Sequence, residues 1–492
     1  MAASEFISDA AIRFKLGRGP PSESGARPSL NRMAASDINL DAAIRARFSG
    51  SDGLDVAAPT QRRQLRFFKL IRIAMAPTKF DVLILGSGTS SQVPVISCLV
   101  AKPPRKGCGC CLSTLAPDGS GRKNARRNTS AIVQFQSPLT TSAQSPDKLS
   151  TVLIDVGKSF CEAAREHFPK HGLDRIDAVL LTHPHADAIN GLDDLRAWTL
   201  DAVIQPTIPI YCNQSTFDEV AKIFPYMVKP GGGTGGGDIP AFQWHIIQTN
   251  VPFDLLGVQV SPLKVYHGCY FNDSGQPLSP YECLAFLFDQ TFCYMSDVSS
   301  IPDSTWTALG CGPALSSLKR KMSNLTEKSF DDSDHPSIST ASSRLDSSSS
   351  LASSAYESDR ASPGLPLLIV DTLRLEPHIS HFGIAEAVET AVKLRAHRTY
   401  LLGFTHGVTH ECWKAACELI GGTSQLENLL STGLLDNLKA ATELGEDPQE
   451  FAQQALALCK HHVKDVLLWI RPAFDGLVIS TDGVKTTDDF YL

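Results

Sequence analysis

The stretch Leu181-Thr182-His183-Pro184-His185-Ala186-Asp187 decides how this chain is interpreted. It follows the apolar run 178–181, which predicts a buried strand, and it precedes a helix-like stretch over 191–198. Alternate residues at a strand end point the same way, so His183 and His185 can bind one metal ion together. Asp187 lies on the turn beyond and can reach a second ion. Such nitrogen and oxygen ligands suit a divalent cation that activates water, which predicts a hydrolytic metal site.

Three more residues of the metal-binding type follow predicted strands downstream. His267 lies just after the predicted strand 258–265, Asp297 follows 291–296, and His406 follows 399–405. A single histidine or aspartate after a strand is usually a solvated loop residue. The ordered series His-x-His-x-Asp, His, Asp, His is much harder to obtain by chance, and it predicts that these residues share one site.

These motifs resemble those of the metallo-β-lactamase-fold hydrolases. The likeness is to the branch containing the cyclic-phosphate phosphodiesterase of phosphonate catabolism and its uncharacterised fungal relatives, and it covers residues 79–480 apart from insertions. Further segments that resemble this branch are 85–94, 126–131, 153–157, 190–196, 378–382 and 474–476. The resemblance implies an α/β fold with αββα sandwich layering. It also implies hydrolysis of a small phosphodiester with one or two divalent ions, zinc or manganese.

The resemblance implies a first metal position that is complete and a second that is not. The implied ligands are His183, His185 and His267 at the first position, and Asp187, Asp297 and His406 at the second. Most relatives carry another histidine directly after the aspartate of the motif, and here Ala188 stands there. A site with fewer nitrogen ligands favours harder ions such as Mn²⁺, or is less occupied. An unusual second metal, a single ion and weak catalysis all stay open.

The implied reaction uses a hydroxide held by the metal ions, which attacks phosphorus. Asp187 or Asp297 would accept the proton, and His381 would protonate the leaving alkoxide. His381 matches a histidine that the family places near its substrate, and its ordinary pKa of about 6.5 suits a proton donor. The other interpretation of His381 is an N-terminal helix position before 382–387, and the sequence favours neither.

Four of the 13 cysteines lie close together, at Cys98, Cys108, Cys110 and Cys111. Cys108-x-x-Cys111 has the spacing of a zinc knuckle. The resembling phosphodiesterases hold a structural zinc with three early cysteines and a late histidine, which implies Cys98, Cys108, Cys111 and His410 here. Cys110 is an alternative to Cys111, and reduced free thiols are the alternative to a zinc site. The odd number of cysteines argues against a disulfide scaffold.

Composition and charge narrow the class of partner. The net charge of −7 predicts no basic surface for nucleic acid, and no apolar run is long enough to span a membrane. We therefore expect a cytoplasmic enzyme that acts on a small molecule, with the nucleus or mitochondrion as alternative locations and a homodimer as an open alternative. A tRNA-processing nuclease is disfavoured because it normally keeps the histidine that Ala188 replaces. Another esterase, a thioesterase, a lactonase and a non-catalytic metal-binding scaffold are the remaining alternatives.

The chain is predicted to contain one catalytic domain, residues 75–492, after a poorly ordered extension at 1–74. Met75 leads directly into the first predicted strand, as a natural start would. The serine-rich stretch 316–363 has few aromatic residues, so it is predicted to be a disordered insertion. The glycine-rich stretch 231–237 is predicted to be a second flexible loop.

Overall fold

The computed structural model describes residues 78–138, 149–228, 237–311, 364–422, 447–464 and 466–491. All of them belong to one compact unit, Ala76–Leu492. The N-terminal extension, the serine-rich insertion and nearly all of the glycine-rich loop lie outside the described residues, so their disorder stays a prediction. No helix within the described ranges has the length and apolar character needed to cross a membrane.

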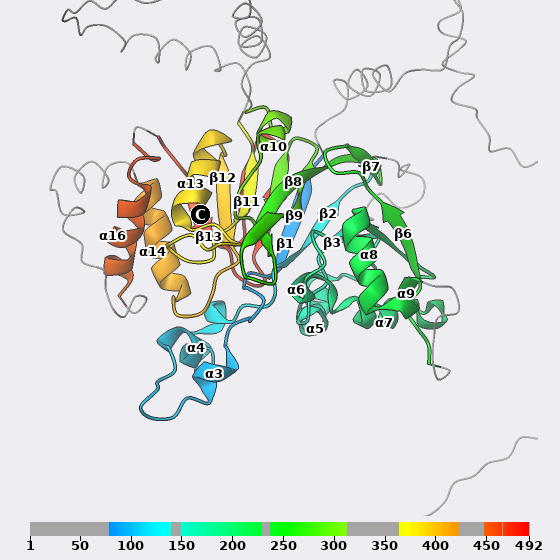
Figure 1. Cartoon of the computed structure of the whole chain (residues 1–492), viewed down its shortest axis with the longest axis horizontal. Helices are drawn as coiled ribbons and strands as arrows, with labels where there is room; N and C mark the ends of the chain where they lie inside the picture. Colours follow the sequence, from blue (N-terminus) through cyan, green and yellow to red (C-terminus); the bar gives the residue numbers. More distant parts are fainter. Residues whose placement is uncertain are drawn as a thin grey trace, which may run out of the picture. The chain divides into compact units, whose positions relative to one another are not determined.

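Eight strands form the first sheet, in the order β15-β14-β1-β2-β3-β4-β5-β6 (Figure 1). Their bounds are Phe80–Gly86 (β1), Ser130–Phe135 (β2), Ser150–Ile154 (β3), Ala178–Leu180 (β4), Ile208–Cys212 (β5), Phe242–Ile246 (β6), Val478–Thr481 (β14) and Thr486–Asp488 (β15). Strands β3 to β6 pair in parallel. Ile154 lies opposite Leu180, so β3 and β4 end at the same sheet edge, where the 181–187 motif begins.

Seven strands form the second sheet, in the order β13-β12-β11-β10-β9-β8-β7. Their bounds are Phe253–Leu255 (β7), Val258–Phe271 (β8), Pro277–Phe288 (β9), Phe292–Met295 (β10), Leu367–Asp371 (β11), Arg398–Leu402 (β12) and Ile470–Pro472 (β13). Strands β10 to β13 pair in parallel. Met295 lies opposite Val370, and Val370 lies opposite Leu401, so the carboxyl ends of three strands meet at one edge.

An aromatic cluster fills the space between the two sheets. The ring of Phe80 on β1 lies 5.6 Å from that of Phe135, 6.1 Å from Phe288 and 5.2 Å from Phe292. All four side chains are buried, and the last two belong to the opposite sheet. Truncating such a side chain to alanine typically costs about 3–5 kcal/mol. The inner faces of both sheets therefore form a single apolar core.

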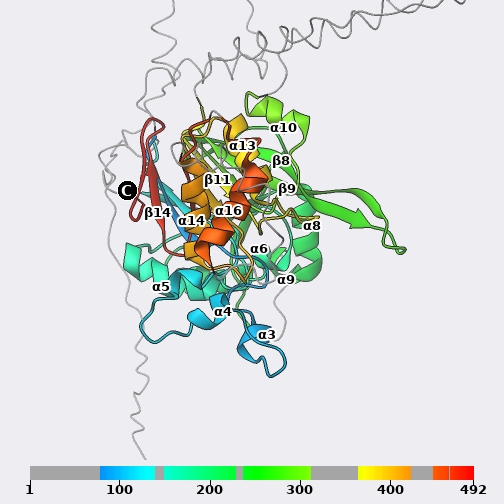
Figure 2. The ribbon, with the colours of Figure 1, turned by 90° about the vertical axis from the view of Figure 1, so that its left-hand side faces the viewer.

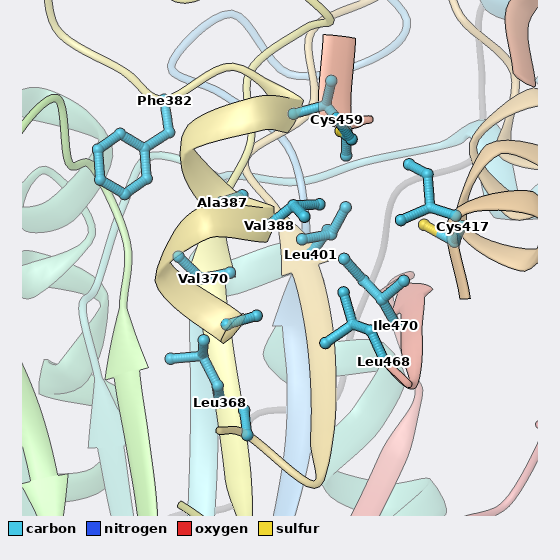
Figure 3. Packing of buried hydrophobic residues seen from close by; sticks show 14 of the residues in the cluster. Leu368, Val370, Phe382, Ala387, Val388, Leu401, Cys417, Cys459, Leu468 and Ile470 are labelled. Atoms are coloured by element: carbon cyan, nitrogen blue, oxygen red, sulfur yellow. The ribbon is translucent and has the colours of Figure 1, made fainter. Parts of the chain in front are cut away.

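Helices cover the two outer faces. The longer ones are Phe160–His171 (α5) and Gln214–Ile223 (α8) on the first sheet, and Ile384–Lys393 (α13), His410–Gly421 (α14) and Pro448–Cys459 (α16) on the second. Short helices are Ile96–Leu99 (α3), Gly109–Ser113 (α4), Ala186–Ile189 (α6), Arg196–Thr199 (α7), Pro225–Val228 (α9) and Asp303–Ala308 (α10). Figure 3 shows Val388 of α13 beside Val370 and Leu401 of the sheet. This arrangement confirms the predicted αββα layering.

The β8–β9 hairpin is longer than the sequence predicts. The apolar runs predict strands only over 258–265 and 284–288, but pairing continues outward until Phe271 lies opposite Pro277. Figure 2 shows the hairpin extending beyond the body of the domain. The outer half of the hairpin is largely exposed, so its sequence shows no apolar alternation. Only the pairing of its two strands identifies it as a hairpin.

Candidate metal centre

Three histidine rings from the two sheets meet at the edge where the parallel strands end. The ring centres of His183 and His185 lie 4.7 Å apart, and each lies 5.1 Å from that of His267. One ring nitrogen from each histidine lies within 4.8 Å of the others. Three imidazoles around one point are the ligand set of a catalytic zinc site that leaves a coordination position open.

Hydrogen bonds fix which nitrogen faces the shared point in two of the three rings. The Nδ1 of His183 lies 2.8 Å from the hydroxyl of Thr182, which donates to Asp155 at 2.7 Å. The Nδ1 of His267 donates to the carbonyl oxygen of Ser380 at 2.7 Å. Both Nε2 atoms are thus left for a ligand, and that of His183 is buried without a partner. Burial lowers the pKa of His183 to about 3, so the ring is neutral and has the lone pair that a metal requires.

Two carboxylates complete the surroundings of the imidazoles. Asp297 follows β10 and forms a second group with His267 and His381. Burial alone would raise the pKa of Asp297, but the imidazoles of His183, His267 and His381 outweigh this and lower it. The Oδ1 of Asp187 is buried without a partner and lies 3.8 Å from Nε2 of His183. An orphaned carboxylate oxygen beside an orphaned imidazole nitrogen is the arrangement expected of residues that hold a cation.

Burial and the nearby charge of Asp297 raise the pKa of Asp187 to about 6. Asp155 and Asp297, which flank the site, both adopt left-handed backbone conformations, with φ of 59° and 52°. Such conformations are unfavourable for residues other than glycine, and they concentrate at functional sites. The edge therefore combines buried charge, unpartnered ligand atoms and backbone strain.

Asp371, which the sequence analysis missed, holds His381 in place. Its Oδ2 accepts from Nδ1 of His381 at 2.8 Å and from the amide of Val298 at 3.2 Å. Burial alone would lower the pKa of His381, but the carboxylate of Asp371 outweighs this and raises it to about 9. The signal that could have found Asp371 is its position directly after the apolar run 367–370, which is the pattern that marked Asp297.

His406 lies with the cysteines and not at the second metal position that the sequence analysis gave it. Its Nδ1 is 3.5 Å from Sγ of Cys98 and 3.5 Å from Sγ of Cys108, and Cys111 completes the group. The sulfur of Cys111 accepts a hydrogen bond from the amide of Val95 at 3.4 Å. Three cysteines and one histidine are the ligand types of a structural zinc site, and their ligand atoms all lie within 4.8 Å of one another.

The loop geometry explains why His410, the predicted fourth ligand, lies elsewhere. The buried guanidinium of Arg126 donates to two carbonyl oxygens of the 405–408 loop and fixes its path, so that His406 faces the cysteines. His410 begins α14, where its buried ring lies 2.9 Å from the hydroxyl of Tyr491. The turn therefore places His406, and not His410, beside the cysteines, and the spacing of the two histidines alone does not reveal this.

Because His406 lies with the cysteines, the second metal position is left with few donor atoms. Of its predicted ligands, only Asp187 and Asp297 lie beside the three imidazoles, and Ala188 is buried without a donor atom. His381 is nearby, but its Nδ1 is committed to Asp371.

Two tyrosine rings lie next to the imidazoles, along the β8–β9 hairpin. The ring of Tyr281 stacks on His185, with ring centres 4.8 Å apart and planes 15° apart. Tyr270 follows at 5.0 Å from Tyr281 and is half exposed. The sequence analysis missed both tyrosines because they lie in the outer part of the hairpin, which carries no predicted strand.

The sequence comparison assigns the family. A family model described as a β-lactamase superfamily domain matches residues 150–315, which include the His183 motif, His267 and Asp297. Residues 150–315 belong to the β-lactamase superfamily. The chain has the metallo-β-lactamase fold, and its histidine and aspartate groups are consistent with the divalent metal site typical of this fold.

Similarity to individual proteins is weaker. The chain is 30% identical over 190 residues to an octanoyltransferase of Porphyromonas gingivalis, which covers 38% of this chain and 30% of that protein. The chain thus spans less than a third of that relative's length, and the activity in its name is not carried over.

Two solved structures align over most of this superfamily member. A diphosphatase of the PhnP family is 22% identical with a TM-score of 0.46, covering 81% of this chain and 96% of that one. Unliganded yeast PDE1 is 12% identical with a TM-score of 0.40, covering 82% and 99%. At these scores the likeness carries no argument about the substrate.

Proposed function

We propose that this chain hydrolyses a small phosphodiester with one divalent ion, bound by His183, His185 and His267. The observation that carries the proposal is the triangle of three imidazoles whose hydrogen bonds leave the Nε2 atoms of His183 and His267 facing a shared point. When bound there, a divalent ion supplies a Lewis acid and lowers the pKa of a water molecule. The phosphodiester class rests on the sequence resemblance described above.

We propose a single ion because few donor atoms remain for another ion beside the three imidazoles. Of the ligands expected for a second ion, only Asp187 and Asp297 remain, and Asp187 has a raised pKa. The imidazoles of the group around Asp297 have other roles, because His267 belongs to the first position and His381 is our proposed proton donor. Two carboxylates without an imidazole make a weak site for a transition metal in competition with a three-histidine site beside it. The three-nitrogen set favours zinc over manganese, because imidazole suits borderline ions.

The carboxylates and His381 would move the protons. Asp187, whose Oδ1 is buried and unpartnered, would accept the proton of the attacking water. His381 would donate a proton from Nε2 to the leaving oxygen, because its Nδ1 is held by Asp371. Water and the diester would thus give a phosphate monoester and an alcohol. Asp297, close to the rings of His183 and His267, would orient the reacting groups.

We further propose that Cys98, Cys108, Cys111 and His406 hold a structural zinc. The sulfurs of Cys98 and Cys108 lie 3.7 Å apart, which is near the separation expected of two thiolates on a tetrahedral zinc with bonds of about 2.3 Å. The short helices α3 and α4 that carry these cysteines bury few apolar residues of their own. A bound ion would therefore stabilise a lobe that has little core.

The first test is hydrolysis of bis(p-nitrophenyl) phosphate by the purified chain, reloaded in parallel with Zn²⁺ and Mn²⁺. We expect turnover that is lost in Asp297→Ala and in His183→Ala. His245→Ala is the matched control, because His245 stacks on Tyr211 and lies outside all three candidate metal groups. Metal analysis of the same samples should give one active-site ion per chain. Bound metal without turnover of any ester would favour the non-catalytic scaffold instead.

A further inference from the structure

A cavity whose lining does not include the three imidazoles lies beside α5. It has a volume of about 440 Å³ and is enclosed by residues 119–124, α5, the start of α14, and the C-terminal segments 474–476 and 489–490. None of the candidate active-site ligands lines it. Small-molecule sites usually measure roughly 300–1,000 Å³, so the cavity has room for a metabolite.

A buried histidine lines this cavity without any hydrogen-bond partner. His167 on α5 is 1% exposed, and neither of its ring nitrogens has a partner among the described residues. Burial lowers its pKa to about 4, so the ring is neutral and has one donor and one acceptor to satisfy. The ring therefore lies in the wall of the cavity with both nitrogens covered, so it adjoins the cavity without offering a hydrogen bond to a ligand.

The acidic groups that line the cavity are already engaged. The two oxygens of Glu166 each accept from an arginine at 2.7 Å, one from Arg122 and one from Arg127. Asp475 accepts from the amide and the hydroxyl of Ser87 and from the amide of Arg127.

The same holds for the two remaining carboxylates. Glu411 pairs with Lys414 at 3.9 Å, and Asp489 accepts from the amide of Val478. Glu166 is therefore neutralised by its two arginines, whereas Glu411 has a looser pair and Asp489 has only an amide contact among the described residues.

Two lysines of the cavity have no such compensation. Within the described ranges, neither Lys123 nor Lys170 forms an ion pair. The ammonium of Lys123 lies 3.2 Å from the ring centre of Phe490 and 5.0 Å from that of Phe474, and Glu411 acts on it only from a longer distance. The two rings fix the ammonium at the cavity wall and offer an apolar surface beside it.

We propose that this cavity binds a small organic anion, a phosphate or carboxylate with an attached planar apolar group. Lys123 and Lys170 would hold the anionic end, the apolar group would lie against Phe474, and His167 in the cavity wall would sense the bound ligand. The site is separate from the metal centre and does not depend on the proposed hydrolytic function.

Nuclear magnetic resonance of the histidine rings tests the proposal on the metal-loaded full chain. The probes are phenylphosphonate, which has no ester bond to hydrolyse, and benzoate, so that the two arms separate phosphate-type from carboxylate-type ligands. The ring nitrogen signals of His167 are assigned by their loss in His167→Gln. We expect at least one probe to shift these signals saturably. We also expect affinity to fall at least about tenfold when Lys123→Gln and Lys170→Gln are combined.

Two control variants decide the interpretation. Lys485→Gln removes an exposed charge from the β14–β15 turn and should leave the affinity unchanged. His183→Ala should also leave it unchanged, because the metal centre is not part of the cavity. The proposal is overturned if neither probe shifts the His167 signals, if the double lysine variant binds equally well, or if His183→Ala abolishes the shift.

Discussion

His381 donates from Nδ1 to Oδ2 of Asp371 over 2.8 Å, at the point where β11 ends. The same oxygen accepts from the amide of Val298, the residue after Asp297. The ends of β10 and β11 are thereby joined through one buried carboxylate. Because the carboxylate fixes Nδ1, it also fixes the direction of Nε2, which is the atom that we propose as proton donor.

Asp371→Asn should therefore impair the proton donor without removing a metal ligand. We expect kcat to fall by about 10–100-fold for alkyl esters, with little change in KM, because only the leaving step loses its positioned proton. The loss should be much smaller for p-nitrophenyl esters, whose leaving group needs no proton. Rates measured against a series of leaving groups check this.

The same leaving-group series provides the controls for Asp371→Asn. His381→Gln should behave alike, and the double variant should be no worse than either single one, because both act through one proton transfer. His397→Gln, on an exposed histidine outside the three candidate metal groups, should have no effect. Equal losses for alkyl and p-nitrophenyl esters would show that Asp371 supports the site only structurally.

The position of His406 beside the cysteines, where His410 was expected, gives a second prediction. His406→Ala should lose the zinc bound by the cysteines, with a decrease in affinity larger than the roughly 10–100-fold that loss of an outer-shell partner costs. His410→Gln should keep that zinc, because His410 contacts Tyr491 and not the cysteines. Zinc content per chain and the midpoint of chelator titration measure the difference. Loss of zinc in His410→Gln alone would contradict the placement of both histidines.

The sequence predicted the fold well because most strands are apolar runs that end in recognisable turns. The parallel pairs β3–β4 and β10–β11 place His183 and Asp297 at the carboxyl ends of their strands. His267, which was expected after a strand, instead lies within the antiparallel strand β8. Strands β6, β7 and β15 were missed, because the pattern of apolar residues does not reveal edge pairing. The sequence did not predict that His406, rather than His410, lies beside the cysteines, and the reason is different. This placement depends on hydrogen bonds from Arg126, which lies about 280 residues away in sequence.

Gly403 offers a third prediction, because it has a left-handed backbone and a close neighbour. Its φ is 83°, and a Cβ atom there would lie 2.2 Å from Oδ1 of Asp371. Gly403→Ala should thus destabilise the fold by at least about 3 kcal/mol, combining backbone strain with displacement of a buried carboxylate. Gly172→Ala is the matched control, because its φ is 65° and no atom lies within 4 Å of the added Cβ.

Denaturant unfolding measures both glycine variants. The control should lose only the cost of a left-handed alanine, about 1–2 kcal/mol. Gly403→Ala should also lower activity, because its Cβ displaces the residue that holds His381. Equal destabilisation by the two substitutions would mean that Asp371 moves aside without cost.

Glu166 gives a prediction about stability and pH. Burial alone would raise its pKa, but hydrogen bonds from Arg127 and Arg122 outweigh this and lower it to about 2. Its ordinary pKa is 4.5, so the folded state favours the charged form. The stabilisation is complete above pH 4.5 and disappears as the pH falls through 2. Because the carboxylate is 32% exposed, solvent screening limits the effect to about 1 kcal/mol.

Glu166→Gln should consequently lower the free energy of unfolding by about 1 kcal/mol at pH 7, and the difference from the parent should shrink steadily below pH 4.5. Urea unfolding at a series of pH values measures this. Glu162→Gln on the same helix is the control, because Glu162 forms no ion pair among the described residues. The control should show no such pH dependence. A constant difference for Glu166→Gln across the whole pH range would show that packing, and not the charge of Glu166, stabilises this part of α5.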